Sequence, residues 1–161
     1  MSVQVGSRAP DVGGVLSDGS VFRVQDHRGT PLVLFFYPKD FTPGCTTEVC
    51  SFRDAFKELS ADKGATILGV SRDDPASHRR FREEYRLPYD LVTDDGSMAK
   101  AFGATWLGGL IAVSKRVTFV IDGEGVVRGV FRHEMLNIDQ HVKDVRGVLA
   151  GLRTGPKAAG G

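Results

Sequence analysis

The stretch FYPKDFTPGCTTEVCSFRD, residues 36–54, holds both cysteines of this 161-residue chain, Cys45 and Cys50. It starts within a continuous apolar run, residues 32–37, which is typical of a central strand covered on both faces. A turn containing proline and glycine follows, and apolar residues then recur at helical spacing. The stretch therefore predicts a buried strand, a turn and a helix, with Cys45 where the helix begins.

Strands and helices are also expected on both sides of this stretch. The cysteine helix is expected to end at Gly64, and a hairpin is expected within residues 12–24 around the turn at residues 17–19. The other expected strands are 66–71, 90–93, 117–121 and 126–131, and the other expected helices are 75–85, 97–102 and 138–152. This order predicts an α/β chain with a thioredoxin-like fold, in which a mixed central β-sheet is flanked by helices on both faces.

The composition is that of one ordinary globular domain. Residues 1–154 are expected to form this single domain, and residues 155–161 a flexible C-terminal tail. Hydrophobic residues make up 41% of the chain and the formal net charge is +1. This balance argues against nucleic-acid and membrane partners, because binding to nucleic acid or to anionic membranes normally requires an excess of clustered Lys and Arg.

The sequence also favours an intracellular location. The apolar run that ends at Tyr37 is far shorter than the roughly 20 residues that span a bilayer, and the first residues lack the pattern of a secretory signal. A cytoplasmic location is therefore expected. Thiols are kept reduced there, so two nearby cysteines indicate catalysis, redox sensing or metal binding rather than a structural disulfide.

Cys45 lies where the unpaired N–H groups and the positive dipole of the helix start favour a thiolate. The thiolate is the reactive form of cysteine, so the position predicts a nucleophile. Cys45 shares the buried stripe of Val49, whereas Cys50 falls on a polar face of the helix and is expected near solvent.

The two cysteines are too far apart to pair while the helix is intact. Five residues of α-helix separate two Cα atoms by roughly 8 to 9 Å, whereas a disulfide needs about 4.4 to 6.8 Å. A bond between Cys45 and Cys50 therefore requires the start of the helix to unwind. A sulfenic acid formed at Cys45 could then condense with the thiol of Cys50.

Other polar residues give weaker signals. A metal site is disfavoured, because two cysteines at this spacing have no matching pair of Cys or His residues. Glu48 is a secondary candidate for the site, since a glutamate in the first helical turn is equally well explained by the helix dipole. Solvent-exposed side chains are expected for the four histidines, His27, His78, His133 and His141.

Pro38, Thr42 and Cys45 match the P-x-x-x-T-x-x-C motif of the peroxiredoxins. The quoted stretch resembles, nearly throughout, the extended motif of the subgroup called bacterioferritin comigratory protein or peroxiredoxin Q. The resemblance runs from VGSRAPD at residues 5–11, through VTFVID at residues 117–122, to the C-terminal helix. It therefore covers nearly the whole chain.

This resemblance implies a thiol-dependent peroxidase that reduces hydrogen peroxide and organic hydroperoxides. Cys45 would be the peroxidatic cysteine and Cys50 the resolving cysteine, joined in an intramolecular disulfide that a thioredoxin-type donor reduces. Thr42 would hydrogen-bond the peroxide, Pro38 would shield the thiolate from water, and Arg116 matches the active-site arginine. A hydroxyl and a cation beside a thiolate orient a peroxide and stabilise the charge that develops as its O–O bond breaks.

The resemblance also sets expectations for cofactors and assembly. No metal, flavin or haem is expected, and the chain should be a monomer or a weak homodimer. The apolar segment from Trp106 to Val113 departs from the family, which often carries a polar segment there. This segment could border the active site or form an interface, and Trp106 could line a substrate pocket or simply pack.

Alternative readings remain open for the site and for the function. Without the motif, Pro38, Thr42 and Arg116 could equally be a strand stop, a helix cap and a solvated charge. A thiol-disulfide oxidoreductase would normally carry cysteines two residues apart, which this chain lacks. A peroxide-responsive redox sensor or a chaperone-like protein could use the same cysteine pair as a switch, and turnover with a reductant would distinguish an enzyme from a sensor.

Overall fold

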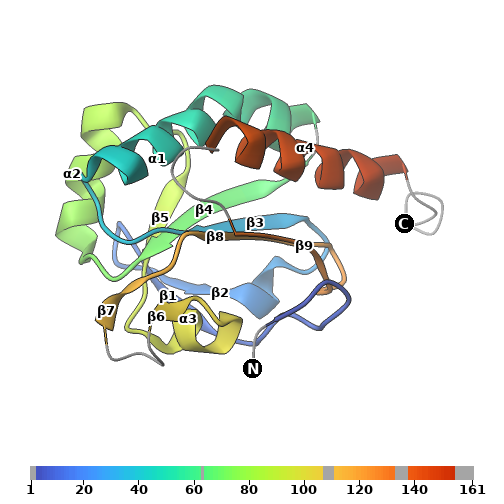
Figure 1. The fold of residues 1–161 in the computed structure, drawn as a ribbon, viewed down its shortest axis with the longest axis horizontal. Helices are drawn as coiled ribbons and strands as arrows, with labels where there is room; N and C mark the ends of the chain where they lie inside the picture. The colour runs from blue at the N-terminus through green and yellow to red at the C-terminus, as the bar shows by residue number, and fades with distance from the viewer. Residues whose placement is uncertain (1–2, 63, 107–110, 133–137, 155–161) are drawn as a thin grey trace.

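A seven-stranded mixed sheet runs through the part of the chain that the computed structural model describes, residues 3–62, 64–106, 111–132 and 138–154. Its strands are β1 (Gly13–Leu16), β2 (Val21–Arg23), β3 (Leu32–Phe36), β4 (Thr66–Ser71), β5 (Asp90–Thr93), β8 (Val117–Ile121) and β9 (Val127–Arg132). They lie in the order β2-β1-β5-β4-β3-β8-β9 (Figure 1). β3, β4 and β5 are parallel, and the other neighbouring pairs are antiparallel. Each strand predicted from the sequence is present.

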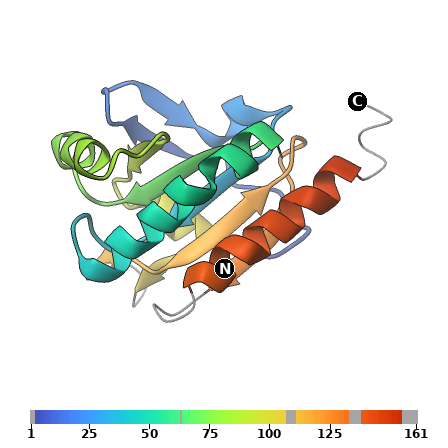
Figure 2. The same cartoon turned by 90° about the horizontal axis from the view of Figure 1, so that it is seen from above.

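Helices cover both faces of this sheet (Figures 1 and 2). One face is covered by α1 (Pro43–Phe56), α2 (Pro75–Tyr85) and α4 (Ile138–Thr154), and the other by the shorter α3 (Ser97–Phe102). A mixed α/β architecture with helices on both faces is therefore confirmed.

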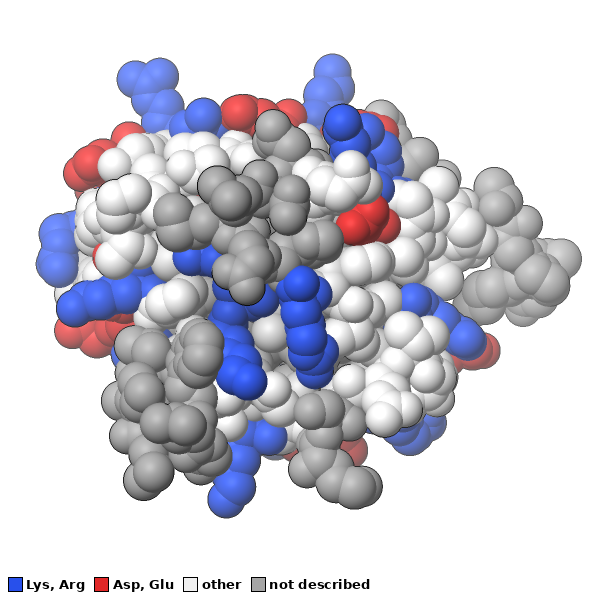
Figure 3. Space-filling model, in the orientation of Figure 1, with Lys and Arg blue, Asp and Glu red and all other residues white. Residues whose placement is uncertain are grey.

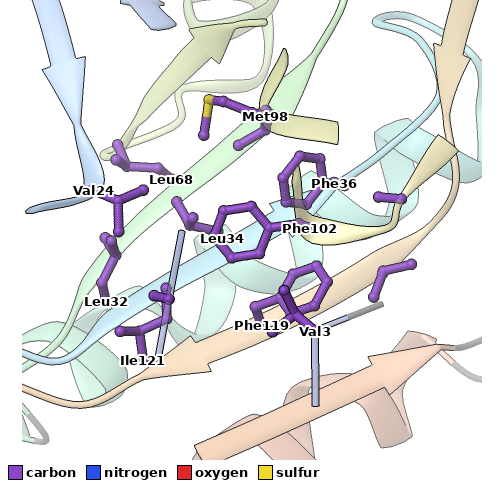
Figure 4. Packing of buried hydrophobic residues seen from close by; sticks show 14 of the residues in the cluster. Val3, Val24, Leu32, Leu34, Phe36, Leu68, Met98, Phe102, Phe119 and Ile121 are labelled. Carbon is purple, nitrogen blue, oxygen red and sulfur yellow. The ribbon is translucent and has the colours of Figure 1, made fainter. Parts of the chain in front are cut away.

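β3 separates two hydrophobic clusters. Leu34 and Phe36 enter the cluster on the α3 side, where the ring of Phe36 meets the edge of Phe119 at 5.6 Å (Figure 4). Phe35 enters the cluster on the α1 side. Every side chain of residues 32–37 is at most 1% exposed, so the predicted burial of this strand on both faces is confirmed.

The two parallel strands β3 and β4 end at the same edge of the sheet. The chain leaves β3 through a loop, residues 37–42, and α1 then begins at Pro43 after Thr42 in an extended conformation. Proline suits the first helical position, because the N–H that it lacks would have no partner there. This edge therefore brings together the loop and the first turn of the cysteine helix.

The cysteine helix differs from the predicted one near its end. α1 ends at Phe56, and the chain continues as a π-helical segment, Lys57–Asp62, before Gly64 turns it with a φ of 72°. Such segments wind more widely than an α-helix. Leu59 is nevertheless fully buried, so the apolar spacing that suggested one continuous helix still delivers this side chain to the core.

A small separate ribbon was not predicted. It pairs β6 (Thr105–Trp106) with β7 (Ile111–Ser114) in antiparallel fashion. Residues 107–110 and 155–161, together with the side chains of Trp106 and residues 111–113, lie outside the described part of the chain. The expectations for the apolar segment and for the C-terminal tail therefore stay predictions.

The surface carries charges of both signs. Figure 3 shows basic and acidic side chains distributed around one face, with uncharged surface between them. Within the described ranges, no helix combines the length and the apolar composition needed to cross a membrane.

Candidate active site

Cys45 is the third residue of α1 and is fully buried, with 0% of its surface exposed. It lies in the first turn, where backbone N–H groups have no carbonyl partner within the helix. These groups and the helix dipole stabilise a negative charge at this point. The buried sulfur therefore lies in the first turn of the helix, the position that the sequence predicted for it.

Arg116 reaches Cys45 from the edge of the sheet. The antiparallel pairing of Phe36 with Val117 brings the preceding residue, Arg116, to the end of β3. Its Nη2 lies 3.5 Å from Cys45 Sγ, and its Nη1 donates to Glu48 Oε1 at 2.5 Å. The guanidinium therefore bridges the Cys45 sulfur and a carboxylate from the same helix.

Glu48, which was only a secondary candidate for the site in the sequence analysis, is a buried carboxylic acid. Its side chain is 0% exposed, and Oε2 has no hydrogen-bond partner among the described residues. Burial raises the pKa of Glu48 to about 7, although Arg116 opposes the rise. A spacing of three residues places Glu48 beside Cys45 on the helix surface, and this spacing is the signal that points to the site.

Thr42 and Pro38 lie in the loop that leads into α1. The Thr42 hydroxyl donates to the Lys39 carbonyl at 2.8 Å, and the Thr42 carbonyl accepts from the Thr46 N–H at 2.8 Å. Pro38 is half-buried. Thr42 therefore begins the helix through its backbone, and its hydroxyl oxygen keeps a free lone pair with which to accept a further hydrogen bond.

Asp40 fixes this loop to the rest of the protein through hydrogen bonds to its side chain. Its carboxylate is 4% exposed and accepts from the Tyr37 hydroxyl at 2.6 Å and from the Ser77 hydroxyl at 2.8 Å. His78 Nδ1 lies 2.8 Å from Asp40 Oδ2, and a carboxylate can only accept, so this ring nitrogen carries the proton. These three contacts, which we call the Asp40 clamp, fasten the loop to the end of β3 and to α2.

A second carboxylate extends the clamp toward β4. The backbone N–H of Asp40 donates to Asp73 Oδ2 at 2.8 Å, and the Ser71 hydroxyl donates to the same oxygen at 2.6 Å. The loop is therefore fastened through its backbone as well as through a side chain.

The expectation of exposed histidines is wrong for two of the four. His78 and His141 are 0% and 1% exposed, because Asp40 and the hydroxyl of Thr118 provide them with buried partners. His27 is half-buried. His133 lies outside the described residues.

Phe41 adopts an unusual backbone conformation within the same loop. Its φ is 66°, a left-handed value that is rare for a bulky residue. The side chain is 41% exposed and its ring lies 4.8 Å from that of Phe81. Strain of this kind persists where the surrounding contacts determine the backbone, and the Asp40 clamp supplies such contacts one residue away.

Cys50 is half-buried, so the prediction that it lies near solvent is only partly correct. It packs against the cluster on the α1 side. Arg53, three residues further along the helix, donates from Nη1 to the carbonyl of Tyr85, the last residue of α2, at 2.8 Å. Burial raises the pKa of the Cys50 thiol, and Arg53 opposes the rise. Both cysteines are free thiols, and the intact helix between them holds their Cα atoms too far apart to bond.

The arrangement supports two-electron sulfur chemistry. A buried sulfur at a helix start, an arginine in contact with it and a second thiol five residues on provide a nucleophile, charge stabilisation and a partner for a disulfide. Among the residues described, no group of three or more His, Cys, Asp or Glu side chains is placed to hold a metal ion.

Comparisons with known proteins agree with this chemistry. The model of the AhpC/TSA family matches residues 5–130. Peroxiredoxin Bcp of Bacillus subtilis is 36% identical over 154 residues, which cover 89% of this chain and 93% of that protein.

Two solved structures are also similar. Peroxidoxin BcpB of Mycobacterium tuberculosis has a TM-score of 0.84 at 35% identity, covering 94% of this chain and 99% of that one. A structure of the bacterioferritin comigratory protein of Xanthomonas campestris, described for its alkyl peroxide reduction activity, has a TM-score of 0.79 at 32% identity, covering 92% of this chain and 96% of that one.

Proposed function

This chain belongs to the AhpC/TSA family, as a peroxiredoxin of the Bcp and Q type, and we propose that Cys45 is its peroxidatic cysteine and Cys50 its resolving cysteine. The chain is therefore a thiol peroxidase, and its predicted family and thioredoxin-like fold are confirmed. The observation that carries the residue assignment is the contact of Arg116 with the Cys45 sulfur at the start of α1.

In the first step, the Cys45 thiolate attacks one peroxide oxygen. The O–O bond breaks, two electrons pass from sulfur to the peroxide, and Cys45 becomes a sulfenic acid. The other oxygen takes up a proton and leaves as water or an alcohol. Arg116 stabilises the charge that develops on the oxygens, Thr42 hydrogen-bonds the peroxide, and Pro38 shields the sulfur from water.

In the second step, the Cys50 sulfur attacks the sulfenic sulfur of Cys45. The S–S bond forms, the S–O bond breaks, and the hydroxyl leaves as water once it is protonated. Because the intact helix separates the two Cα atoms by roughly 8 to 9 Å, the start of α1 must unwind before this bond can form.

In the third step, a dithiol donor of the thioredoxin type reduces the disulfide by thiol exchange. Both hydrogen peroxide and organic hydroperoxides serve as substrates, in line with the alkyl peroxide reduction named for the Xanthomonas relative. The proposed enzyme acts in the cytoplasm as a monomer or a weak homodimer, and its residues carry the cycle without a metal, flavin or haem.

The test follows NADPH consumption in the presence of thioredoxin, thioredoxin reductase and hydrogen peroxide. Wild type is expected to turn over steadily, Cys45→Ser to be inactive and Cys50→Ser to be much slower. Arg116→Met is expected to react with peroxide about a hundredfold more slowly, the usual loss on removing one donor to a developing negative charge. Arg128→Met, on the exposed surface of β9, is the matched control.

Mass spectrometry of the peroxide-treated protein tests the disulfide directly. A bond between Cys45 and Cys50 is expected after one equivalent of peroxide. Oxidation without this bond would contradict the role given to Cys50. A bond that forms but is not turned over by thioredoxin would instead point to another donor or to a sensor.

A further inference from the structure

The unwinding of α1 is opposed by a contact from outside the helix. The Tyr89 hydroxyl donates to the backbone carbonyl of Val49 at 2.5 Å. Val49 directly precedes Cys50 and lies between the two cysteines that the proposed function joins. Any movement that redirects this part of the backbone must stretch or break the hydrogen bond.

Tyr89 is firmly held where it makes this contact. It is 4% exposed and directly precedes β5, which pairs in parallel with β4 inside the sheet. Its ring lies 5.7 Å from Phe35 in an edge-on arrangement and 6.2 Å from Phe56. The hydroxyl is therefore fixed to the sheet, whereas the carbonyl that it holds belongs to the helix that must move.

The Tyr89 hydroxyl also stays protonated, so it remains a hydrogen-bond donor. Burial raises the pKa of its phenol well above the ordinary value, and the nearby Glu48 carboxylate adds to the rise. The phenol therefore keeps its proton near neutral pH and can donate the hydrogen bond to the Val49 carbonyl.

We propose that Tyr89 is a positioning residue for the resolution step, in which its hydroxyl holds the Val49 carbonyl and thereby slows the opening of α1 that brings Cys45 and Cys50 together. This inference rests on the proposed function, because it assumes that these two cysteines form the disulfide. A slower opening lengthens the life of the Cys45 sulfenic acid. It therefore gives a second peroxide more time to oxidise this group to the sulfinic acid.

Tyr89→Phe tests the inference by removing one oxygen atom and leaving the ring in place. The protein is mixed with one equivalent of hydrogen peroxide, quenched at short times and analysed by mass spectrometry for sulfenic acid and disulfide. Losing one buried neutral hydrogen bond is expected to speed disulfide formation about three- to tenfold. The rate at which peroxide oxidises Cys45 should stay unchanged, and the sulfinic fraction in excess peroxide should fall by a similar factor.

Tyr85→Phe is the matched control, because it removes a tyrosine hydroxyl from the end of α2, four residues before Tyr89, and leaves the Tyr89 contact intact. Its rate of disulfide formation should equal that of wild type. Hydrogen exchange of the reduced protein gives a second readout. In Tyr89→Phe, exchange should rise several-fold in the peptide that covers residues 45–56 and stay unchanged in β4 and α4.

The outcomes separate this inference from the proposed function. A folded Tyr89→Phe protein that forms the disulfide no faster than wild type would overturn the role of Tyr89 and leave the cysteine assignment intact. Exchange that rises throughout the protein would also overturn it, because the hydroxyl would then support the whole fold rather than one helix. A wild-type protein that forms no bond between Cys45 and Cys50 would overturn both.

Discussion

Two buried carboxylates lie on either side of Cys45 in the sequence, and they differ in how many hydrogen bonds they accept. Asp40 and Glu48 are 4% and 0% exposed. Asp40 accepts three hydrogen bonds, from the end of β3 and from α2. Glu48 accepts from Arg116 alone, and within the described residues its second oxygen has no partner.

This difference assigns different tasks to the two groups. Hydrogen bonds to a carboxylate favour its charged form and fix its position, whereas burial without enough partners favours the neutral acid. Asp40 therefore acts as a fixed point for the loop that precedes Cys45. Glu48, with its pKa raised to about 7, can change its charge beside Arg116 near neutral pH.

Asp40→Ala is expected to have the largest effect on stability. It would leave the Tyr37 hydroxyl, the Ser77 hydroxyl and the His78 imidazole without their acceptor, and each buried unpaired polar group costs roughly 1 to 3 kcal/mol. The free energy of unfolding should fall by about 4 kcal/mol. Chemical denaturation of the reduced protein measures this change.

The matched control for Asp40→Ala is Glu84→Ala, which removes an exposed carboxylate from α2 and should leave the denaturation midpoint nearly unchanged. A fall of less than about 1 kcal/mol for Asp40→Ala would contradict the view that Asp40 is a fixed point for the loop, because its three donors would then not depend on it.

Glu48→Gln should alter the pH dependence of stability. The pKa of Glu48 is about 7 in the folded protein, above the ordinary 4.5, so folding favours the protonated acid. Its contribution to stability is fully present below pH 4.5 and is lost as the pH rises through 7. At 1.36 kcal/mol per pKa unit, the loss is about 3 kcal/mol.

The measurement for Glu48 is the free energy of unfolding of wild type and Glu48→Gln at a series of pH values between 4 and 8. The difference between the two proteins should change in favour of the variant as the pH rises, because glutamine cannot ionise. Glu83→Gln, on the exposed surface of α2, should follow wild type. A difference that does not vary with pH would mean that the pKa of Glu48 is the same in the folded and the unfolded protein, which would contradict the rise caused by burial.

Ser77→Ala is expected to have the smallest effect of the three. It removes one of the donors to Asp40 and leaves the contacts from Tyr37 and His78 in place. The free energy of unfolding should fall by about 1 kcal/mol, measured by the same denaturation. A fall as large as that of Asp40→Ala would instead show that the three donors to Asp40 act as one cooperative unit.

Features that depend on neighbours in the sequence could be predicted. The apolar run at residues 32–37 predicted a strand buried on both faces, and the turn before Cys45 predicted a cysteine at a helix start. Arg116 is distant in sequence and was found only through the family resemblance. Its contact with Cys45 depends on the register of β3 against β8, which no local pattern reveals.

Features that depend on tertiary contacts were missed. Asp40 and His78 are 38 residues apart in the chain, and the sequence gives no sign that α2 supplies a partner for the loop after β3. A histidine without a visible partner is reasonably assigned to solvent, so His78 was misplaced. Glu48 was undervalued for a related reason, because helical spacing shows which side chains share a face but not which face the sheet edge covers.

β3 also has a consequence for how the protein unfolds. Its alternate side chains belong to the hydrophobic clusters on the two faces of the sheet, so both clusters depend on the same strand. Unfolding of the helices on either face would expose one face of β3 to water. The exposed strand would then no longer hold in place the side chains that pack in the cluster on its opposite face. The two layers are therefore expected to melt together, in a single cooperative transition.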